Sequence, residues 1–449
     1  MSRLPSGWAE TQLGSLIERV EAGLNVKCEE RPPQGKERGL VKISAVTWGR
    51  FNEEQSKTLP ADITVSANAQ IQTGDLLFSR ANTIELVGAT VLVEEIEKHL
   101  YLSDKVLRLV VPAESKRWIN YAMKTAVVRK AIQDASSGNQ LSMRNISQEK
   151  LRQIPIPLAP LPEQKRIADK LDSVLARVDA CRDRLDRLPA LLKRFRQSIL
   201  NAATSGRLTE DWRGNSPHEW SSDRLGSVAK FIDYRGKTPI KTASGTPLIT
   251  AKNVRRGFVS FEPREFIAES DYDTWMTRGF PSKGDVLITT EAPLGNIAVI
   301  EWDFKFALAQ RIICLQFDEQ IVGAYAAIAL QSDAFQTQLS EQSTGSTVAG
   351  IKASRLKELQ IQIPSLDEQT EIVRRFEILF AFADRLEARL ANARQQVGQL
   401  TPALLAKAFR GELVAQDPAD EPATELLKRL AAQREAAPKI KRSRKIANP

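Results

Sequence analysis

The sequence contains a long internal repeat with a fixed spacing. The run Leu161-Pro162-Glu163-Gln164 returns 205 residues later as Leu366-Asp367-Glu368-Gln369. The same spacing relates Gly206-Arg207-Leu208 to Gly411-Glu412-Leu413 without a gap. A period of this length is far too long for a solenoid of short repeats. The chain is therefore predicted to hold two copies of one unit, each a globular domain followed by a helix, with approximate two-fold symmetry.

The similarity continues more weakly through the two globular halves. Residues 40–43 match residues 248–251, and both runs end in a turn, at Gly49 and at Gly257. Between the matched anchors the halves differ almost completely. Two related scaffolds with unrelated surfaces indicate one task performed on two different targets.

Each half combines short strands with helices. A glycine turn that leads into an apolar strand, a second apolar strand and a helical stretch follow one another in both copies. These elements are expected at residues 74–77 and 284–287, 106–110 and 312–315, and 118–133 and 322–339. Mixed short strands with one or two helices predict an α+β domain of about 150 residues in each half.

A long heptad pattern follows each globular half. Apolar residues recur there in alternating steps of four and three, the period of a helix with one supercoiled partner. The main seam positions are Ile167, Leu171, Val178, Leu185, Leu192, Ile372, Phe376, Leu379, Leu386 and Leu390. A helix of about 40 residues is roughly 60 Å long, more than one domain needs for its own core. The simplest arrangement is an antiparallel coiled coil of the two helices, with a globular half at each end. Pairing with another subunit is the alternative.

Two prolines bear on these helices. Pro189 falls inside the first helix and is expected to kink it, because proline removes a backbone hydrogen bond. Thr401-Pro402 resembles an N-cap followed by a first-turn proline, so the second helix is expected to break and restart there.

Composition favours an anionic partner and a reducing compartment. The net charge is +9, which makes nucleic acid the leading candidate partner, although a basic protein without such a role is the alternative. Cys28, Cys181 and Cys314 lie far apart, which argues against a disulfide framework. No apolar run is long enough for a membrane span, and the start of the chain lacks a secretory signal. We therefore expect a cytoplasmic protein that contacts no membrane.

The spacer motifs carry a resemblance to a known family. The run Ile154-Pro155-Ile156-Pro157-Leu158-Ala159-Pro160-Leu161-Pro162-Glu163-Gln164, with residues 192–200 and 206–209, resembles the first spacer of Type I restriction-modification specificity subunits. Residues 368–375 and 406–413 resemble the second spacer of that family. The resemblance extends in layout over nearly the whole chain.

This resemblance implies a bipartite organisation. Each globular half would be a target recognition domain for one half of a split double-stranded DNA site. The helical spacers would fix the gap between the half-sites and dock two methyltransferase subunits, which restriction subunits then join. The expected parts are recognition domain 1 at residues 1–158, a central spacer helix at 159–213, recognition domain 2 at 214–364, a distal spacer helix at 365–415 and a basic C-terminal tail at 416–449, with a short helical stretch near 424–434.

Candidate DNA-binding residues are the Arg, Lys, Asn and Gln side chains in polar loops beside the strands, because these side chains contact bases and phosphates. In the first half they are Arg80, Asn82, Lys105, Asn139, Gln140 and Arg144. In the second half they are Arg235, Lys237, Lys252, Asn253, Arg255, Arg256, Arg311 and Lys352. A solvated surface charge is the alternative for each one singly.

No catalytic residue, metal site or bound cofactor is predicted for this chain. His99 and His218 are isolated, and the glycine loop that ends at Lys352 lacks the Lys-Ser/Thr pair of a phosphate-binding loop. S-adenosylmethionine and ATP are expected on partner subunits. The sequence therefore predicts a non-catalytic subunit that directs methyltransferase and restriction subunits to a bipartite site. The alternatives are a DNA methyltransferase or nuclease with fused recognition domains, and a coiled-coil scaffold without a DNA role.

Overall fold

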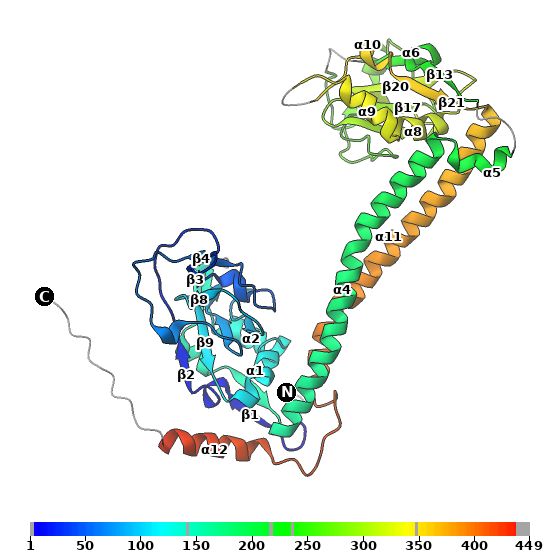
Figure 1. Ribbon diagram of the computed structural model, residues 1–449. Coiled ribbons are helices and arrows are strands. Elements are labelled where there is room, and N and C mark those ends of the chain that lie inside the picture. The colour runs from blue at the N-terminus through cyan, green and yellow to red at the C-terminus, as the bar shows by residue number, and fades with distance from the viewer. Residues whose placement is uncertain (1–3, 141–142, 215–218, 235–237, 346–348, 437–449) are drawn as a thin grey trace. The chain divides into compact units, whose positions relative to one another are not determined.

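The chain forms two compact units joined by two long helices (Figure 1). The computed structural model describes residues 4–140, 143–214, 219–234, 238–345 and 349–436, without the side chains of Asn139 and Gln140. Unit 1 comprises Met1–Asp183 and Arg394–Pro449, and unit 2 comprises Arg184–Ala393. Helix α4 (Leu161–Thr204) begins in unit 1 and ends in unit 2, whereas α11 (Leu366–Ala408) runs the other way along the chain.

Unit 1 contains four small sheets among its described residues. One has the strand order β10 (Ser137–Gln140), β11 (Met143–Asn145), β6 (Ala81–Asn82), and the other three form the framework that recurs in unit 2. Of these three, the first, in the order β2-β9-β5-β7, is antiparallel; the second, β4-β3-β8, contains a parallel pair, β3 with β8; and the third pairs β1 with β12. The strands are β1 (Ala9–Gln12), β2 (Arg19–Glu21), β3 (Arg38–Val41), β4 (Ser56–Thr58), β5 (Leu76–Ser79), β7 (Thr90–Leu92), β8 (His99–Tyr101), β9 (Val106–Val110) and β12 (Pro155–Leu158).

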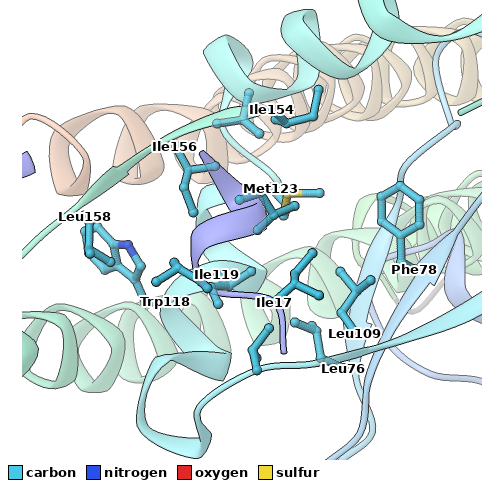
Figure 2. Close-up of a cluster of buried hydrophobic side chains, with 14 of the residues drawn as sticks. Ile17, Leu76, Phe78, Leu109, Trp118, Ile119, Met123, Ile154, Ile156 and Leu158 are labelled. Carbon is cyan, nitrogen blue, oxygen red and sulfur yellow. The ribbon is translucent and has the colours of Figure 1, made fainter. Parts of the chain in front are cut away.

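The four-stranded sheet of unit 1 is buried on both faces. Side chains alternate across a strand, so Leu76 and Phe78 of β5 enter one apolar cluster while Leu77 enters another. The first cluster is completed by Trp118 and Ile119 of helix α1 (Lys116–Ala122), as Figure 2 shows. Full burial of a large apolar side chain contributes about 1.5–3 kcal/mol, which explains why residues 76–78 of the central strand β5 are apolar at three consecutive positions.

Unit 2 repeats three of these four sheets with the same strand order. Its sheets run β14-β20-β17-β18, β16-β15-β19 and β13-β21, again with one parallel pair, β15 with β19. The strands are β13 (Ser221–Arg224), β14 (Ala229–Asp233), β15 (Thr246–Ile249), β16 (Phe266–Ile267), β17 (Val286–Thr290), β18 (Leu294–Val299), β19 (Ala307–Leu308), β20 (Ile312–Phe317) and β21 (Gln360–Ile363). The predicted duplication of an α+β domain is confirmed.

The helical stretch expected in each half is two helices rather than one. In unit 1 these are α1 and α2 (Ala126–Ala135), and in unit 2 they are α8 (Gly323–Gln331) and α9 (Asp333–Glu341). The second helix of each pair starts at a side-chain cap: Thr125 accepts from the backbone N–H of Val128, and Ser332 accepts from that of Phe335. Caps of this kind favour a new helix start over continuation.

Helices α4 and α11 pair with each other in antiparallel orientation, as predicted. In unit 1, Ile167 and Leu171 of α4 share an apolar cluster with Leu405 and Ala408 of α11. In unit 2, the rings of Phe195 and Phe382 lie 6.4 Å apart, and Arg196 pairs with Asp384 at 2.5 Å and Glu387 at 3.1 Å. Each predicted seam residue is buried or half-buried.

The two prolines do not interrupt these helices. Pro189 lies inside α4, and α11 continues through Pro402 to Ala408, so the predicted break at Thr401-Pro402 is wrong. An internal proline costs about 3 kcal/mol or more. Beyond Pro402, Leu405 and Ala408 are buried in the core of unit 1, and this packing offsets the cost.

The segment after α11 packs onto unit 1. Helix α12 (Ala423–Ala436) buries Ala423 and Leu426 in the same cluster as Trp118, and the N–H of Ala423 donates to the carbonyl of Gly7 at 2.9 Å. Arg166 near the start of α4 pairs with Asp420 at 2.6 Å. The short helix expected near residues 424–434 is thus present, and it belongs to the folded unit. The basic residues that end the chain lie outside the described residues.

Candidate nucleic-acid interface

A buried Trp–Glu hydrogen bond fixes the start of each long helix to its own domain. The indole N–H of Trp8 donates to Glu163 at 3.0 Å, and that of Trp220 donates to Glu368 at 3.0 Å. Each indole packs edge to face on a second aromatic ring, Trp118 in unit 1 and Tyr325 in unit 2. The repeated Glu-Gln motif thus fixes each globular domain to its helix, a role that the sequence did not assign.

The two buried glutamates differ in their charged neighbours. Burial raises the pKa of Glu163 above its ordinary value. Burial acts in the same direction on Glu368, but hydrogen bonds from Thr209, Arg213 and Trp220 outweigh it and lower the pKa of that carboxyl. Glu368 is therefore held as a carboxylate in an ion pair with Arg213, whereas the charged form of Glu163 is less favoured.

One end of the four-stranded sheet has the same construction in both units. The backbone N–H of Arg80 donates to the carbonyl of Lys105 at 2.9 Å, and that of Thr290 donates to the carbonyl of Arg311 at 3.0 Å. Lys105 and Arg311 immediately precede β9 and β20 and are both exposed. The structure therefore brings two predicted DNA-binding residues to equivalent places in the two domains.

Other candidates of unit 1 gather at this sheet end. Strand β11 (Met143–Asn145) pairs with β6 (Ala81–Asn82), and Arg144 lies opposite Asn82. The guanidinium of Arg144 donates to the carbonyls of Ser136 at 2.7 Å and Gly138 at 2.8 Å. Arg144 thus holds the adjoining hairpin. Asn139 and Gln140 lie in its other strand, β10 (Ser137–Gln140), but their side chains lie outside the described residues.

The equivalent end in unit 2 presents Arg311 and Lys352. The Arg311 guanidinium lies 3.7 Å from the carboxylate of Glu291, and both side chains are about half exposed. Arg311 has a φ of 72°, a left-handed conformation that costs a non-glycine residue energy, and residues with such strain cluster at functional sites. Lys352 is exposed next to Ile351, whose N–H donates to the carbonyl of Thr290 at 3.0 Å.

The basic run at residues 252–256 divides into exposed and buried members. Lys252, Arg255 and Arg256 are exposed, whereas Asn253 is buried. The Asn253 amide oxygen accepts from the N–H and hydroxyl of Thr250, and its NH₂ donates to the carbonyls of Ser260 and Pro263. Its amide is used inside the protein, which corrects the expectation that it faces DNA. Arg235 and Lys237 lie outside the described residues.

An apolar hollow of about 430 Å³ lies between α4 and α11 within unit 2. Its lining includes the seam residues Leu185, Leu192, Leu386 and Leu390. Leu188 and Leu191 at its edge are 37% and 46% exposed, and Phe382 is 44% exposed. Exposed apolar surface of this kind marks an interaction or binding site.

Two other kinds of site are missing from the described part of the chain. No group of His, Cys, Asp and Glu side chains there could hold a metal ion. None of the described helices is at once long and apolar enough to cross a membrane.

Comparisons with known proteins agree with this duplicated architecture. Residues 5–190 and 217–393 match the family model of the Type I restriction modification DNA specificity domain. The chain is 34% identical over 335 residues to the Type I restriction enzyme EcoBI specificity subunit of Escherichia coli, covering 68% of this chain and 70% of that protein. It is 28% identical to the EcoKI specificity subunit of Escherichia coli (strain K12), over 99% of both chains.

Solved structures share the fold. The HsdS subunit from Thermoanaerobacter tengcongensis matches with a TM-score of 0.60 and 21% identity, over 91% of this chain and 98% of that one. A chain from a study of assembly and conformational transition of the type I R-M system matches with a TM-score of 0.61 and 18% identity, over 92% of this chain and 100% of that one.

Proposed function

The chain belongs to the family of Type I restriction-modification DNA specificity subunits, and from this membership we infer that it recognises a bipartite DNA target and directs partner subunits to it. One observation supports this function above all. The same domain occurs twice, with equivalent sheet ends that carry different side chains. Two such domains in one chain suit two unlike half-sites.

The chain is a recognition subunit without catalysis of its own. Its relatives are specificity subunits, and nothing in the comparisons favours a methyltransferase or nuclease with fused recognition domains. Purified chain supplied with S-adenosylmethionine and DNA should therefore transfer no methyl groups. Methylation by the chain alone would overturn this assignment.

Its partners are DNA and the modification and restriction subunits of a Type I complex. We further propose that two methyltransferase subunits dock on the helix pair, and the apolar hollow between α4 and α11 supports a helical contact there. S-adenosylmethionine and ATP would bind to the partner subunits. The complex would act in the cytoplasm, where the DNA of the cell lies.

Lys105 and Arg311 are the strongest proposed DNA contacts. They are exposed, they stand at equivalent sheet ends, and Arg311 carries a costly backbone conformation. Arg80, Asn82, Arg144 and Lys352 are proposed to shape or flank these surfaces. Direct base contacts would distinguish the half-sites, and phosphate contacts would set the orientation of each domain.

Single-molecule methylome sequencing tests the function directly. A host that carries this chain together with its methyltransferase subunit should show methylated adenines in two fixed half-sites separated by a constant gap. The same host without this chain should lose that pattern. Methylation at a single continuous site, or a pattern that persists without the chain, would contradict the proposal.

A further inference from the structure

A loop of the same construction follows β3 in unit 1 and β15 in unit 2. In residues 45–52 the carbonyl of Ala45 accepts from the N–H of Asn52 at 3.0 Å. In residues 253–260 the carbonyl of Asn253 accepts from the N–H of Ser260 at 2.8 Å. We name them the paired loops. Gly49 and Gly257 occupy the same position in the two loops, with φ of 85° and 90°.

Each of the paired loops exposes a large aromatic ring. Trp48 is 75% exposed and Phe258 is 58% exposed. Isolated exposed apolar side chains are common on protein surfaces and need no explanation. Here an exposed ring adjoins the same glycine in two domains whose surfaces otherwise differ, before Gly49 in unit 1 and after Gly257 in unit 2, so a shared role is the better account.

The paired loops are anchored, so the exposed rings are held in place. In unit 1, Arg50 pairs with Asp179 at 2.8 Å, and Lys124 donates to the carbonyl of Gly49 at 3.4 Å. In unit 2, the N–H of Gly257 donates to the carbonyl of Ile297, and the Asn296 amide donates to the carbonyl of Val254.

Both loops lie beside the proposed DNA-binding surface. The Asn82 amide donates to the hydroxyl of Thr47 at 3.3 Å, next to Trp48, and Asn82 lies opposite Arg144 across the β6–β11 pair. In unit 2 the loop is bonded to β18, which forms a hairpin with β17, and Thr290 at the end of β17 is bonded to Arg311. Each ring is therefore a neighbour of the sheet end rather than a remote surface residue.

Charge near the rings favours DNA as the partner. Arg255 and Arg256 precede Phe258, and both are exposed. Among the described residues neither forms an ion pair with an acid. An aromatic ring with arginines beside it suits double-stranded DNA, because the arginines neutralise phosphates while the ring packs on sugars or between base edges. A protein partner would more simply cover the uncharged hollow on the helix pair.

We propose that Trp48 and Phe258 are equivalent DNA contacts, one for each half-site, a proposal that rests on the function inferred above. Each ring packs against the sugars or base edges of its half-site, and in unit 2 Arg255 and Arg256 bind the adjoining phosphates.

The test uses the complex of this chain with its methyltransferase subunits and duplexes that carry both half-sites or only one. Trp48→Ala should weaken binding on the order of tenfold to duplexes that contain the half-site of unit 1. It should leave binding through the other half-site unchanged, and Phe258→Ala should show the opposite pattern. Trp48→Phe should retain most of the affinity, because a ring remains.

Salt dependence separates the rings from the arginines. Removing an apolar ring releases no counterion, so Trp48→Ala should leave the slope of log affinity against log salt unchanged. Replacing Arg255 and Arg256 with Gln should reduce that slope by about two. Phe280→Ala is the matched control, because Phe280 is 54% exposed but precedes the turn at the opposite end of β17.

Three outcomes would overturn the proposal. Wild-type affinity in both alanine variants would refute it while leaving the specificity function intact. Loss of methyltransferase subunits from the complex, with an equal effect on both half-sites, would assign the rings to a protein interface. Failure of the wild-type complex to prefer the bipartite duplex would refute the proposed function, and this inference with it.

Discussion

A buried glutamate lies in the first turn of each long helix, and of the two only Glu368 forms an ion pair with a residue that the structure describes. Glu368 accepts from Trp220 and pairs with Arg213, whereas Glu163 accepts from Trp8. Each carboxylate also accepts from a further neutral donor, Thr209 at Glu368 and Gln416 at Glu163. The two glutamates offer a matched comparison of a buried charge with and without its counter-ion.

Glu368→Gln is expected to lower the free energy of unfolding by about 2 kcal/mol at neutral pH, because an amide cannot replace the ion pair with the largely buried Arg213. Glu163→Gln should cost less than about 1 kcal/mol, since the amide oxygen still accepts from Trp8. Denaturant titrations of the two variants measure the difference. Equal losses would show that the ion pair contributes nothing.

The pH dependence of stability provides a second test of Glu368 and Glu163. The pKa of Glu368 is lowered in the folded chain, so its stabilisation is present above the ordinary value of 4.5 and is lost as pH falls through the folded pKa. The pKa of Glu163 is raised, so protonation of that carboxyl on acidification does not destabilise the fold. Below pH 4.5, hydrogen exchange should accelerate at the start of α11 before it does at the start of α4.

Lys105 and Arg311 test the equivalence of the two sheet ends. Replacing either with Gln should weaken binding of the complex to DNA through one half-site and reduce the salt slope by about one, because one phosphate contact is lost. Lys283→Gln is the control, since Lys283 precedes the turn at the opposite end of β17. DNA affinity measured across salt concentrations tests this prediction. A loss of affinity in Lys283→Gln as large as that in Arg311→Gln would argue against a local contact.

For single residues, the sequence predicts the chemical type of a side chain's contacts better than its position in the fold. Repeat alignment brings Lys105 and Arg311 to matched places before the strands, as the structure does. Asn253 has a side chain suited to base contacts, yet its NH₂ group already donates to two backbone carbonyls of the same segment. Those partners lie seven and ten residues further along the chain, and only the folded loop brings them to the amide.

Among the elements, the long helices are the most predictable. The heptad period states which residues face a partner, and those residues are buried or half-buried between α4 and α11. Pro402 misleads, because local propensity counts the lost hydrogen bond but not the burial of Leu405 and Ala408 beyond it. The second helix of each domain begins after Thr125 or Ser332 because the side chain of that residue caps it. A polar residue inside a helical stretch of sequence does not show by itself that it will cap a new helix.

The hollow between α4 and α11 should behave as a docking surface. Leu188→Glu is expected to weaken binding of a methyltransferase subunit at least tenfold, because it places a charge in a site that docking would dehydrate. The change should leave the fold intact, since Leu188 is already 37% exposed. Pull-down titration against purified subunits measures the loss. Ile378→Glu, at a 53% exposed position outside the hollow lining, should bind normally.

For the whole molecule, duplication was visible in the sequence because the spacers keep one offset. The recognition domains were harder to align, since their surfaces differ and insertions shift their register. Their equivalence rests on backbone features instead, such as the same strand order and the same hydrogen bonds at the sheet ends. A sequence records these features only as scattered glycines and apolar positions.

The antiparallel pairing allows a sharp test of the helices as a spacer. Deleting residues 180–186 from α4 together with 391–397 from α11 removes one heptad from each helix at facing levels, given that Leu171 packs near Leu405 and Phe195 near Phe382. The pair shortens by about 10 Å, so the accepted gap between the half-sites should shrink by about three base pairs. Methylome sequencing should find the half-site sequences unchanged. An unaltered gap would refute the spacer role.

Deleting the heptad from α4 alone provides the contrast. The seam would then lose its register beyond the deletion, and stability rather than gap length should suffer. A single deletion that shortened the gap without loss of stability would argue against the paired arrangement as the determinant of spacing.

The division of the chain between the two units determines the order in which their cores can be completed during synthesis. Unit 2 is one continuous stretch, Arg184–Ala393, whereas unit 1 needs both Met1–Asp183 and Arg394–Pro449. During synthesis from the N-terminus, unit 2 has all of its residues before the last part of unit 1 has been translated. Until then the buried partners of Trp118 and Ile167 at the end of α11 and in α12 are missing, although those residues were made first. Unit 1 can therefore complete its core only after the whole of unit 2 has been synthesised.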